Sequence, residues 1–302
     1  MKTDFYSHGK LLLTAEYVVL DGAKALAVPT KLGQSLEVFP TENKELHWKS
    51  INEKNEVWLE EKFQLPFEKN GGTKNPVAKK LLQILTEAAR FNPNLFIKNQ
   101  GFQVTTKMEF PQNWGLGSSS TLINNLAEWF QIDAYELLEK TFGGSGYDIA
   151  CAKNDSPIVF ERYGKEKTVS RAAFSPIFKN QLFFVHLNQK QDSRKAIEHY
   201  RKQEKKHLSE AIIDISKITE KLIVCEKMED FEKLLTHHEQ IISSLIGLPP
   251  VKKQLFSDYP HVIKSLGGWG GDFVLVVGGE NEKDYFRKKG FETIVDYTRM
   301  VL

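Results

Sequence analysis

The order of secondary-structure signals in the 302-residue sequence predicts a mixed α+β fold. Its first half gives strand signals, a helix, a further strand, a glycine- and serine-rich loop and a second helix, in that order. This order lacks the regular strand–helix repetition that builds a parallel α/β sheet. The length is also suited to two domains, which we place at residues 1–170 and 171–302.

Strands are predicted in the first sixty residues. Apolar and β-branched runs flank Asp21-Gly22, a dipeptide typical of hairpin turns. Residues 35–39, 45–49 and 55–60 alternate in polarity or carry Trp and Val, so each predicts a further strand.

The rest of the chain supplies helices and more strands. "NPVAKKLLQILTEAARF" (75–91) begins with Asn-Pro and repeats apolar residues at helical spacing, and "GFQVTTKMEF" (101–110) alternates as a strand. "QLFFVHLN" (181–188) predicts a buried strand. Residues 193–245 predict an antiparallel helix pair with Lys- and Glu-rich solvated faces. "GGWGGDFVLVVGG" (267–279) predicts a glycine loop followed by a strand.

Composition narrows the class of protein. The 41 Lys and Arg nearly balance the 39 Asp and Glu, which argues against nucleic-acid or acidic-membrane binding. Cys151 and Cys225 are far apart and form no CxxC pair, so neither a zinc site nor a disulfide framework is expected. No apolar stretch reaches membrane-spanning length, and the N-terminus lacks a hydrophobic signal region. We therefore expect a cytoplasmic protein.

"PQNWGLGSSSTLINNLAEWF" (111–130) carries the strongest local signal. A helix start needs one capping residue, whereas this stretch offers three serines and a threonine. Glycines let a phosphate approach the backbone, and the amides and hydroxyls at a helix N-terminus bind anions. The stretch has neither the P-loop nor the GxGxxG spacing, so phosphate binding and a tight turn with a redundant cap both stay open.

Two further glycine-rich stretches add weaker signals. "GGSGYDIACA" places Asp148 after a turn, where it could cap a helix or orient a substrate hydroxyl, as phosphoryl transfer requires. "KSLGGWGGDFVLVV" has four glycines, too many for one hairpin, with Asp272 interpreted as a turn residue.

Four motifs occur in the order characteristic of one superfamily: "HGKLLLTAEYVVLDG", "PQNWGLGSSS", "GGSGYDIA" and "KSLGGWGGDFVL". They span nearly the whole chain, which resembles the GHMP small-molecule kinases. That superfamily includes galactokinase, homoserine kinase, mevalonate kinase and phosphomevalonate kinase. The motif forms are most similar to those of phosphomevalonate kinases, and those of mevalonate kinases differ little.

The resemblance implies an N-terminal domain like ribosomal protein S5 domain 2 and an α+β GHMP C-terminal domain, with ATP and substrate in the cleft between them. It implies that the serine-rich loop wraps the ATP phosphates, with Ser118 or Ser119 close to Mg²⁺. The implied ATP-binding residues are Gly115, Leu116, Gly117, Ser118, Ser119, Ser120 and Thr121.

The resemblance also implies the catalytic pair. Asp148 matches the Asp that accepts the proton or orients the acceptor, and Lys10 matches the Lys that stabilises charge on the transferring group. Glu136 and Glu139 are considered as the acidic Mg²⁺ ligand, with a solvent-facing helix charge as the alternative, and Glu136 is retained with Ser119. The substrate-binding positions implied are Glu16, Tyr17, Ser145, Gly146, Ser193, Arg194, Gly267, Gly268, Gly270 and Gly271.

The chain departs from the usual pattern at Ala15, Asn113, Trp114, Gly268 and Trp269. The two tryptophans could pack together, or one could stack on a ligand. They bear on substrate identity more than on reaction type.

The sequence therefore predicts ATP- and Mg²⁺-dependent phosphoryl transfer to phosphomevalonate or mevalonate, by a monomer or homodimer. The alternatives are a sugar or homoserine kinase and a non-catalytic nucleotide-binding sensor. A related decarboxylase is disfavoured by the opening with Lys10.

Overall fold

A computed structural model describes residues 2–67, 73–96, 100–204 and 206–302. The chain forms two compact units, each built from separated segments. Unit 1 contains residues 1–9, 32–112 and 117–153, and unit 2 contains residues 10–31, 113–116 and 154–302. A single division at residue 170 does not describe these units, because residues 25–27 pair with a strand formed by residues 158–163 and so belong with the C-terminal half.

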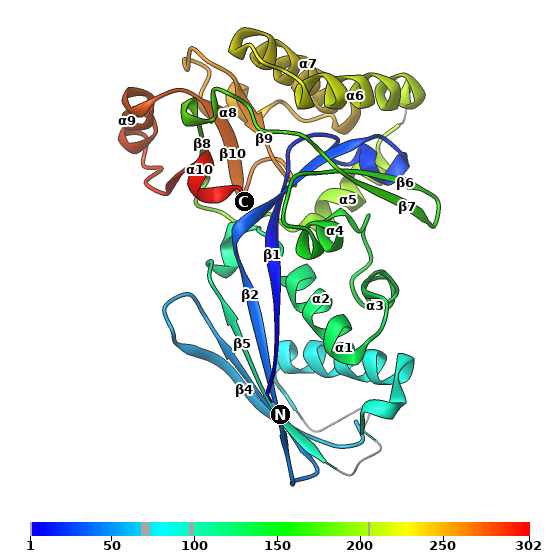
Figure 1. Cartoon of the computed structure of the whole chain (residues 1–302). Coiled ribbons are helices and arrows are strands. Elements are labelled where there is room, and N and C mark those ends of the chain that lie inside the picture. The colour runs from blue at the N-terminus through cyan, green and yellow to red at the C-terminus, as the bar shows by residue number, and fades with distance from the viewer. Residues whose placement is uncertain (1, 68–72, 97–99, 205) are drawn as a thin grey trace. The chain divides into compact units, whose positions relative to one another are not determined.

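Unit 1 contains a twisted sheet whose strands follow the order β4-β3-β5-β2 (Figure 1). These strands are β4 (Val57–Gln64), β3 (Glu45–Ile51), β5 (Gly101–Met108) and part of β2 (Ala25–Thr41). β3 and β5 are parallel, whereas the other neighbours on this path are antiparallel, and β1 (Thr3–Leu12) also pairs with β2. The three strands expected in the first sixty residues are confirmed, with shifted ends.

The helices of unit 1 cover one face of this sheet. They are α1 (Pro76–Phe91), α2 (Ser118–Phe130), α3 (Ala134–Thr141) and α4 (Tyr147–Lys153). α1 begins as its sequence predicts, because the Asn75 side chain accepts hydrogen bonds from the amides of Val77 and Ala78 and Pro76 needs no amide partner.

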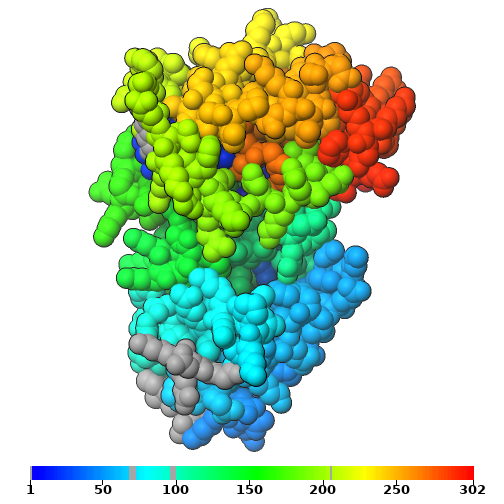
Figure 2. All heavy atoms as spheres, turned by 180° about the vertical axis from the view of Figure 1, so that it is seen from behind, coloured from blue at the N-terminus to red at the C-terminus, as the bar shows by residue number. Residues whose placement is uncertain are grey.

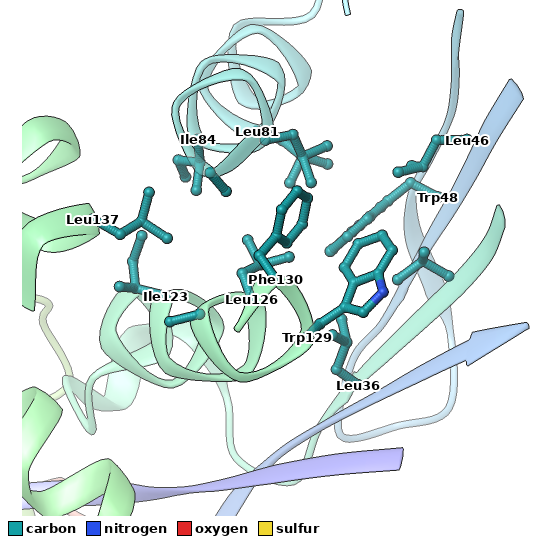
Figure 3. Close-up of a cluster of buried hydrophobic side chains, with 14 of the residues drawn as sticks. Leu36, Leu46, Trp48, Leu81, Ile84, Ile123, Leu126, Trp129, Phe130 and Leu137 are labelled. Atoms are coloured by element: carbon teal, nitrogen blue, oxygen red, sulfur yellow. The ribbon is translucent and has the colours of Figure 1, made fainter. Parts of the chain in front are cut away.

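Figure 3 shows how this core is filled from both layers. Leu36, Leu46 and Trp48 point from the strands toward the helices, and α2 contributes Trp129 and Phe130. Each of these strand residues is separated from the next inward-facing one by a polar or exposed position, as expected of a sheet with one covered face. The covered face fixes α2, and with it the loop that begins this helix.

Unit 2 contains a second, antiparallel sheet in the order β11-β8-β10-β9. Its strands are β8 (Leu182–His186), β9 (Ile263–Ser265), β10 (Phe273–Val277) and β11 (Ile294–Asp296). β8 and β10 are buried throughout, as the predicted strand at 181–188 and the predicted strand after the glycine loop require. The hairpin β6 (Ile158–Tyr163) and β7 (Glu166–Arg171) pairs with the first residues of β2.

The helices of unit 2 include the predicted antiparallel pair, α6 (Leu208–Ile223) and α7 (Met228–Ile246). The others are α5 (Ser193–Lys202), α8 (Val251–Leu255), α9 (Glu280–Lys288) and α10 (Tyr297–Met300). Residues 280–302 gather in one surface patch of this unit, orange-red to red in Figure 2. No helix in the described parts of the chain has the length and apolar character needed to cross a membrane.

The predicted hairpin turn at Asp21-Gly22 is wrong. Residues Val18–Asp21 form a 3-10 helix, and Gly22 ends it in the left-handed conformation at φ 102°. The Asp-Gly pair is used here as a helix end, because a glycine with positive φ serves that role as well as it serves a hairpin.

Candidate functional site

The serine-rich loop leads into α2 without a side-chain cap. Gly117 occupies the N-cap position at φ 89°, and no side chain accepts from the first amides of the helix. The Ser120 hydroxyl donates instead to the carbonyl of Gly117 (2.7 Å), and that of Thr121 donates to Oε1 of Gln34 (2.6 Å). The serines are thus not needed as caps, which supports the expectation that they have another use.

The start of α2 fits an anionic ligand. A thirteen-residue helix presents a partial positive charge and unpaired amides at its N-terminus, and here no acidic residue lies in the first turn. The side chain of Ser119 is exposed and that of Ser118 is half-buried, and no hydrogen bond of either hydroxyl occurs among the described residues. These two hydroxyls and the helix amides are the groups that would hold a phosphate.

Unit 2 contains residues 113–116, the first part of this loop, together with Lys10. The Lys10 amide donates to the carbonyl of Leu116 (2.9 Å), and its Nζ donates to the carbonyl of Gly115 (3.0 Å). Main chain and side chain of Lys10 therefore both contact the glycine loop. The first and second motifs meet here, as the resemblance implies.

Unit 1 contains Asp148, in the first turn of the short helix α4 and half-buried. The negative charges of Asp133 and Asp148 and, above all, burial raise the pKa of Tyr135 to about 12, which places the Asp148 carboxylate near that phenol. Ser145 and Gly146 precede it in a buried turn where Gly146 has φ 95°. Lys10 belongs to unit 2 and Asp148 to unit 1, and their pairing stays a prediction.

Gln191 brings the third glycine motif together with the start of α5. Its Nε2 donates to the carbonyls of Gly268 (3.0 Å) and Trp269 (2.9 Å). A Cβ at Gly268 would lie 2.4 Å from Cγ of Gln191, so glycine is required there for the close approach. Two predicted substrate segments, the third motif and Ser193–Arg194, therefore lie at one place in unit 2.

The residues at these two segments differ in exposure. Ser193 and Arg194 are exposed at the first turn of α5, where Asp192 caps the helix by accepting from the Arg194 amide (3.0 Å). Gly267 and Gly270 adopt φ 58° and 99° and are half-buried. Gly268 and Gly271 are buried.

Glu16 lies in a buried group of charged side chains. Its Oε1 accepts from Nζ of Lys264 (2.5 Å), and the same ammonium lies 3.2 Å from Oε1 of Glu239. His238 accepts from the amide of Ala15 through Nε2 (2.9 Å), and Ser265 donates to Glu239 (2.6 Å). We call Glu16, His238, Glu239, Lys264 and Ser265 the buried ionic cluster.

The cluster holds two carboxylates against one ammonium. Burial is the main reason that the pKa of Glu16 is raised to about 7 and that the pKa of Glu239 is raised, while burial lowers the pKa of His238 and keeps its imidazole neutral. Glu16 is 1% exposed. In this structure its carboxylate pairs with the Lys264 ammonium and is not accessible to a substrate.

Tyr17 is also buried, beside α5. Its ring lies 5.3 Å from that of Tyr200, centroid to centroid, and the Tyr200 hydroxyl donates to Asp21 (2.5 Å). Ala15 and Tyr17 both have positive φ, 67° and 66°. The loop from 15 to 17 is thus a strained backbone held by its neighbours, an arrangement that tertiary contacts must maintain.

The two tryptophans pack on different partners. The Trp114 ring lies edge-on to Phe273 at 5.2 Å and near His186, whose Nε2 lies 3.1 Å from the carbonyl of Asn113. Trp269 is buried, with φ 51° and a ring nitrogen that has no hydrogen-bond partner among the described residues. No ring contact joins the two tryptophans within the described ranges.

The proposed magnesium ligands do not form a group. Ser119 lies in the first turn of α2, whereas Glu136 lies in the first turn of α3, which follows the far end of α2 about 16 Å along the helix. Glu136 is exposed, as Glu139 is, and its charge suits the N-terminus of α3. No set of three or more His, Cys, Asp or Glu side chains in the described residues could hold a metal ion. Glu136 is therefore corrected to a surface helix charge, and Ser119 alone is retained.

No sequence pattern predicts the contacts of Gln191 and Lys264 or the packing of Asp272. The φ of 54° at Asp272 agrees with the predicted turn, but its carboxyl also packs against Gly115. Its position at the end of a glycine run was the only signal available.

Comparisons with known proteins support the fold. No protein-family model and no curated protein matches the sequence. Among solved structures, the chain is similar to the mevalonate kinase of Methanococcus jannaschii, with 18% identity, 97% of both chains covered and a TM-score of 0.71. It is also similar to the Streptococcus pneumoniae phosphomevalonate kinase solved with phosphomevalonate and AMPPNP (14% identity, 97% of this chain and 99% of that chain, TM-score 0.68).

A third similar structure is the Lactococcus lactis galactokinase complexed with galactose, with 14% identity, 95% of this chain and 88% of that chain covered, and a TM-score of 0.68. The chain thus has the two-domain α+β fold of GHMP kinases over nearly its full length, and the predicted fold is confirmed.

Proposed function

We propose that this protein is a small-molecule kinase that transfers the γ-phosphoryl group of ATP to a hydroxyl or phosphate oxygen of its acceptor. One observation carries the proposal. The glycine loop leads into α2 without a side-chain cap, and the Gly115 carbonyl of this loop accepts a hydrogen bond from the Lys10 ammonium. A helix N-terminus next to a cation is suited to a triphosphate. The fold shared with solved kinases of this kind supports it.

In the proposed reaction, the α2 amides and the Ser118 and Ser119 hydroxyls hold the phosphates. An acceptor oxygen attacks the γ-phosphorus, the bond to the oxygen of the leaving ADP breaks, and Asp148 takes or orients the acceptor's proton. Lys10 stabilises the negative charge that develops on the transferred group. Bound Mg²⁺ would neutralise phosphate charge, and Ser119 is the residue that would hold it.

For the acceptor we propose phosphomevalonate or mevalonate. Arg194 and Lys195 are exposed at the start of α5, beside the third glycine motif, and could pair with a carboxylate or phosphate. Neutral sugars lack both groups, so they are the second choice. Homoserine carries a carboxylate, as mevalonate does, and the assay below distinguishes the two acceptors. We further expect a cytoplasmic monomer or homodimer with no nucleic-acid partner.

The test is ADP release measured with mevalonate, phosphomevalonate, galactose and homoserine, for the wild type and for Lys10→Met. We expect turnover with one of the first two acceptors and its loss in the variant. Turnover with galactose or homoserine would keep the reaction and change the acceptor. ATP binding without turnover on any of the four would instead favour a nucleotide-binding sensor.

A further inference from the structure

Three of the four sequence motifs meet at Gly115, through Lys10, Gly115 and Asp272, which all belong to unit 2. The Lys10 ammonium donates to the Gly115 carbonyl (3.0 Å), and the Asp272 carboxyl group packs against the Gly115 Cα. A Cβ at position 115 would lie 2.3 Å from Cγ of Asp272 and 2.4 Å from its Oδ2. Only glycine permits this approach, and the φ of 67° at Gly115 also favours glycine.

The Asp272 side chain is aimed at this point by its backbone. Its amide donates to the carbonyl of Gln189 (2.8 Å), and its carbonyl accepts from the amide of Leu187 (2.8 Å). Its Oδ1 accepts from the amide of Gln191 (3.2 Å), and its φ of 54° is a conformation that Asp and Asn adopt more readily than most residues. The carboxylate is therefore fixed against Gly115.

The charges around Asp272 single out Lys10. The carboxyl group is largely buried, which raises its pKa, and the positive charge of Lys10 is the largest influence that lowers it, ahead of His186 and Lys190. A carboxylate at a phosphate-binding loop would repel a triphosphate unless a cation balanced it. Lys10 is the cation that touches the same glycine.

We propose that Asp272 is a positioning residue for Lys10: its fixed carboxylate keeps the ammonium charged and directed at the Gly115 carbonyl, beside the start of the phosphate loop. The placement of Asp272 and Lys10 on either side of Gly115 rests on the geometry of unit 2. Its catalytic meaning rests on the proposed kinase function.

The test is the pH dependence of Lys10 acylation by an amine-reactive reagent, read at residue 10 by peptide mass spectrometry. Asp272→Asn keeps the shape, the acceptor oxygen and the tolerance for a left-handed backbone, and removes only the charge. A neighbouring opposite charge favours the charged form of a lysine and raises its pKa by about one unit. We therefore expect the midpoint of Lys10 labelling to fall by about one pH unit in the variant, with about tenfold faster labelling below it.

Asp284→Asn is the matched control, because Asp284 is an exposed carboxylate on α9 paired with Arg287. Its Lys10 labelling profile should equal that of the wild type. Asp272→Gly is the second variant, since glycine also suits a positive φ, and it should show the same shift as Asp272→Asn if the latter folds poorly.

The outcomes separate this inference from the proposed function. A labelling midpoint unchanged in both Asp272 variants would overturn the positioning role, whether or not the protein is a kinase. A shifted midpoint in a protein that turns over no acceptor would keep the Asp272–Lys10 coupling and refute the kinase proposal. If both hold, Asp272→Asn should lower kcat and move the basic limb of its pH profile by the same unit.

Discussion

Gly115 lacks the one atom that would separate Asp272 from the backbone of the glycine-rich loop. At the scale of single residues, this is how the site is organised: the absence of a side chain lets a carboxylate and an ammonium reach the same peptide. Gly268 acts in the same way for Gln191. The sequence shows such glycines but not which residue fills the space they leave.

Asp148→Asn tests the proposed proton acceptor. The amide cannot take a proton, so we expect kcat to fall by roughly a hundredfold or more, while nucleotide affinity changes little because Asp148 lies outside the phosphate loop. Steady-state kinetics and nucleotide titration check the two halves of this expectation.

Asp155→Asn is the control, because Asp155 is an exposed carboxylate a few residues further along the chain and should leave both values unchanged. Near-normal turnover of Asp148→Asn would remove Asp148 from the mechanism.

At the scale of elements, the buried ionic cluster joins three parts of unit 2. Glu16 comes from the loop after β1, His238 and Glu239 come from α7, and Lys264 comes from β9. Buried ion pairs add little net stability over an apolar core, but losing one partner leaves a charge unbalanced. The cluster therefore fixes where these elements meet, including the strained loop at Ala15 and Tyr17.

Lys264→Met should destabilise the protein by about 3–5 kcal/mol, because it leaves two buried carboxylates without a cation. Chemical unfolding of the variant and the wild type measures the difference. Lys289→Met removes an exposed lysine paired with Asp258 and should cost less than about 1 kcal/mol. Equal effects of the two substitutions would contradict the role given to the cluster.

The pH dependence of stability is expected to report on Glu16. Its pKa is raised to about 7 when folded, from 4.5, so the folded state binds the proton more tightly than the unfolded state. The stabilisation from this group is complete below pH 4.5 and is lost as the pH rises to about 7.

Glu16→Gln removes that dependence. Relative to the wild type, the variant should therefore become more stable between pH 5 and pH 8, by about 3 kcal/mol at most in the free energy of unfolding. Guanidinium unfolding at both pH values checks this. A difference that is the same at the two pH values would show that Glu16 does not titrate in this range.

At the scale of the whole molecule, the chain passes between the two units several times. β1 and β2 each have residues in both units, and the glycine-rich loop does too, with Gly115 in unit 2 and Gly117 in unit 1. A nucleotide bound along this loop, as proposed above, would stabilise the folded protein.

Thermal unfolding with and without Mg·ATP tests this expectation. At a nucleotide concentration one hundred times the Kd, binding contributes about 2.7 kcal/mol, which corresponds to about 4 °C for a chain of this length. Gly115→Ala should lose most of that shift, because a Cβ there collides with Asp272. An unchanged transition in saturating Mg·ATP would contradict nucleotide binding by the wild type.

The fold was largely predictable because its signals are local. The Asn75 cap, the apolar periodicity of α1 and the buried runs of β8 and β10 each depend on neighbouring residues. The Asp21-Gly22 turn was not, because the same dipeptide can end a helix or form a hairpin, and the choice depends on packing.

The sequence by itself determined the α+β class, the glycine loops, and the identities of Lys10 and Asp148 as the charged residues to test. Only the tertiary structure decided that Asp272 and Lys10 meet at Gly115. It also decided that Glu16 is buried in an ion pair with Lys264, and that Glu136 lies apart from Ser119. The physical reason is that these contacts join residues distant along the chain, and burial and electrostatic pairing act through space.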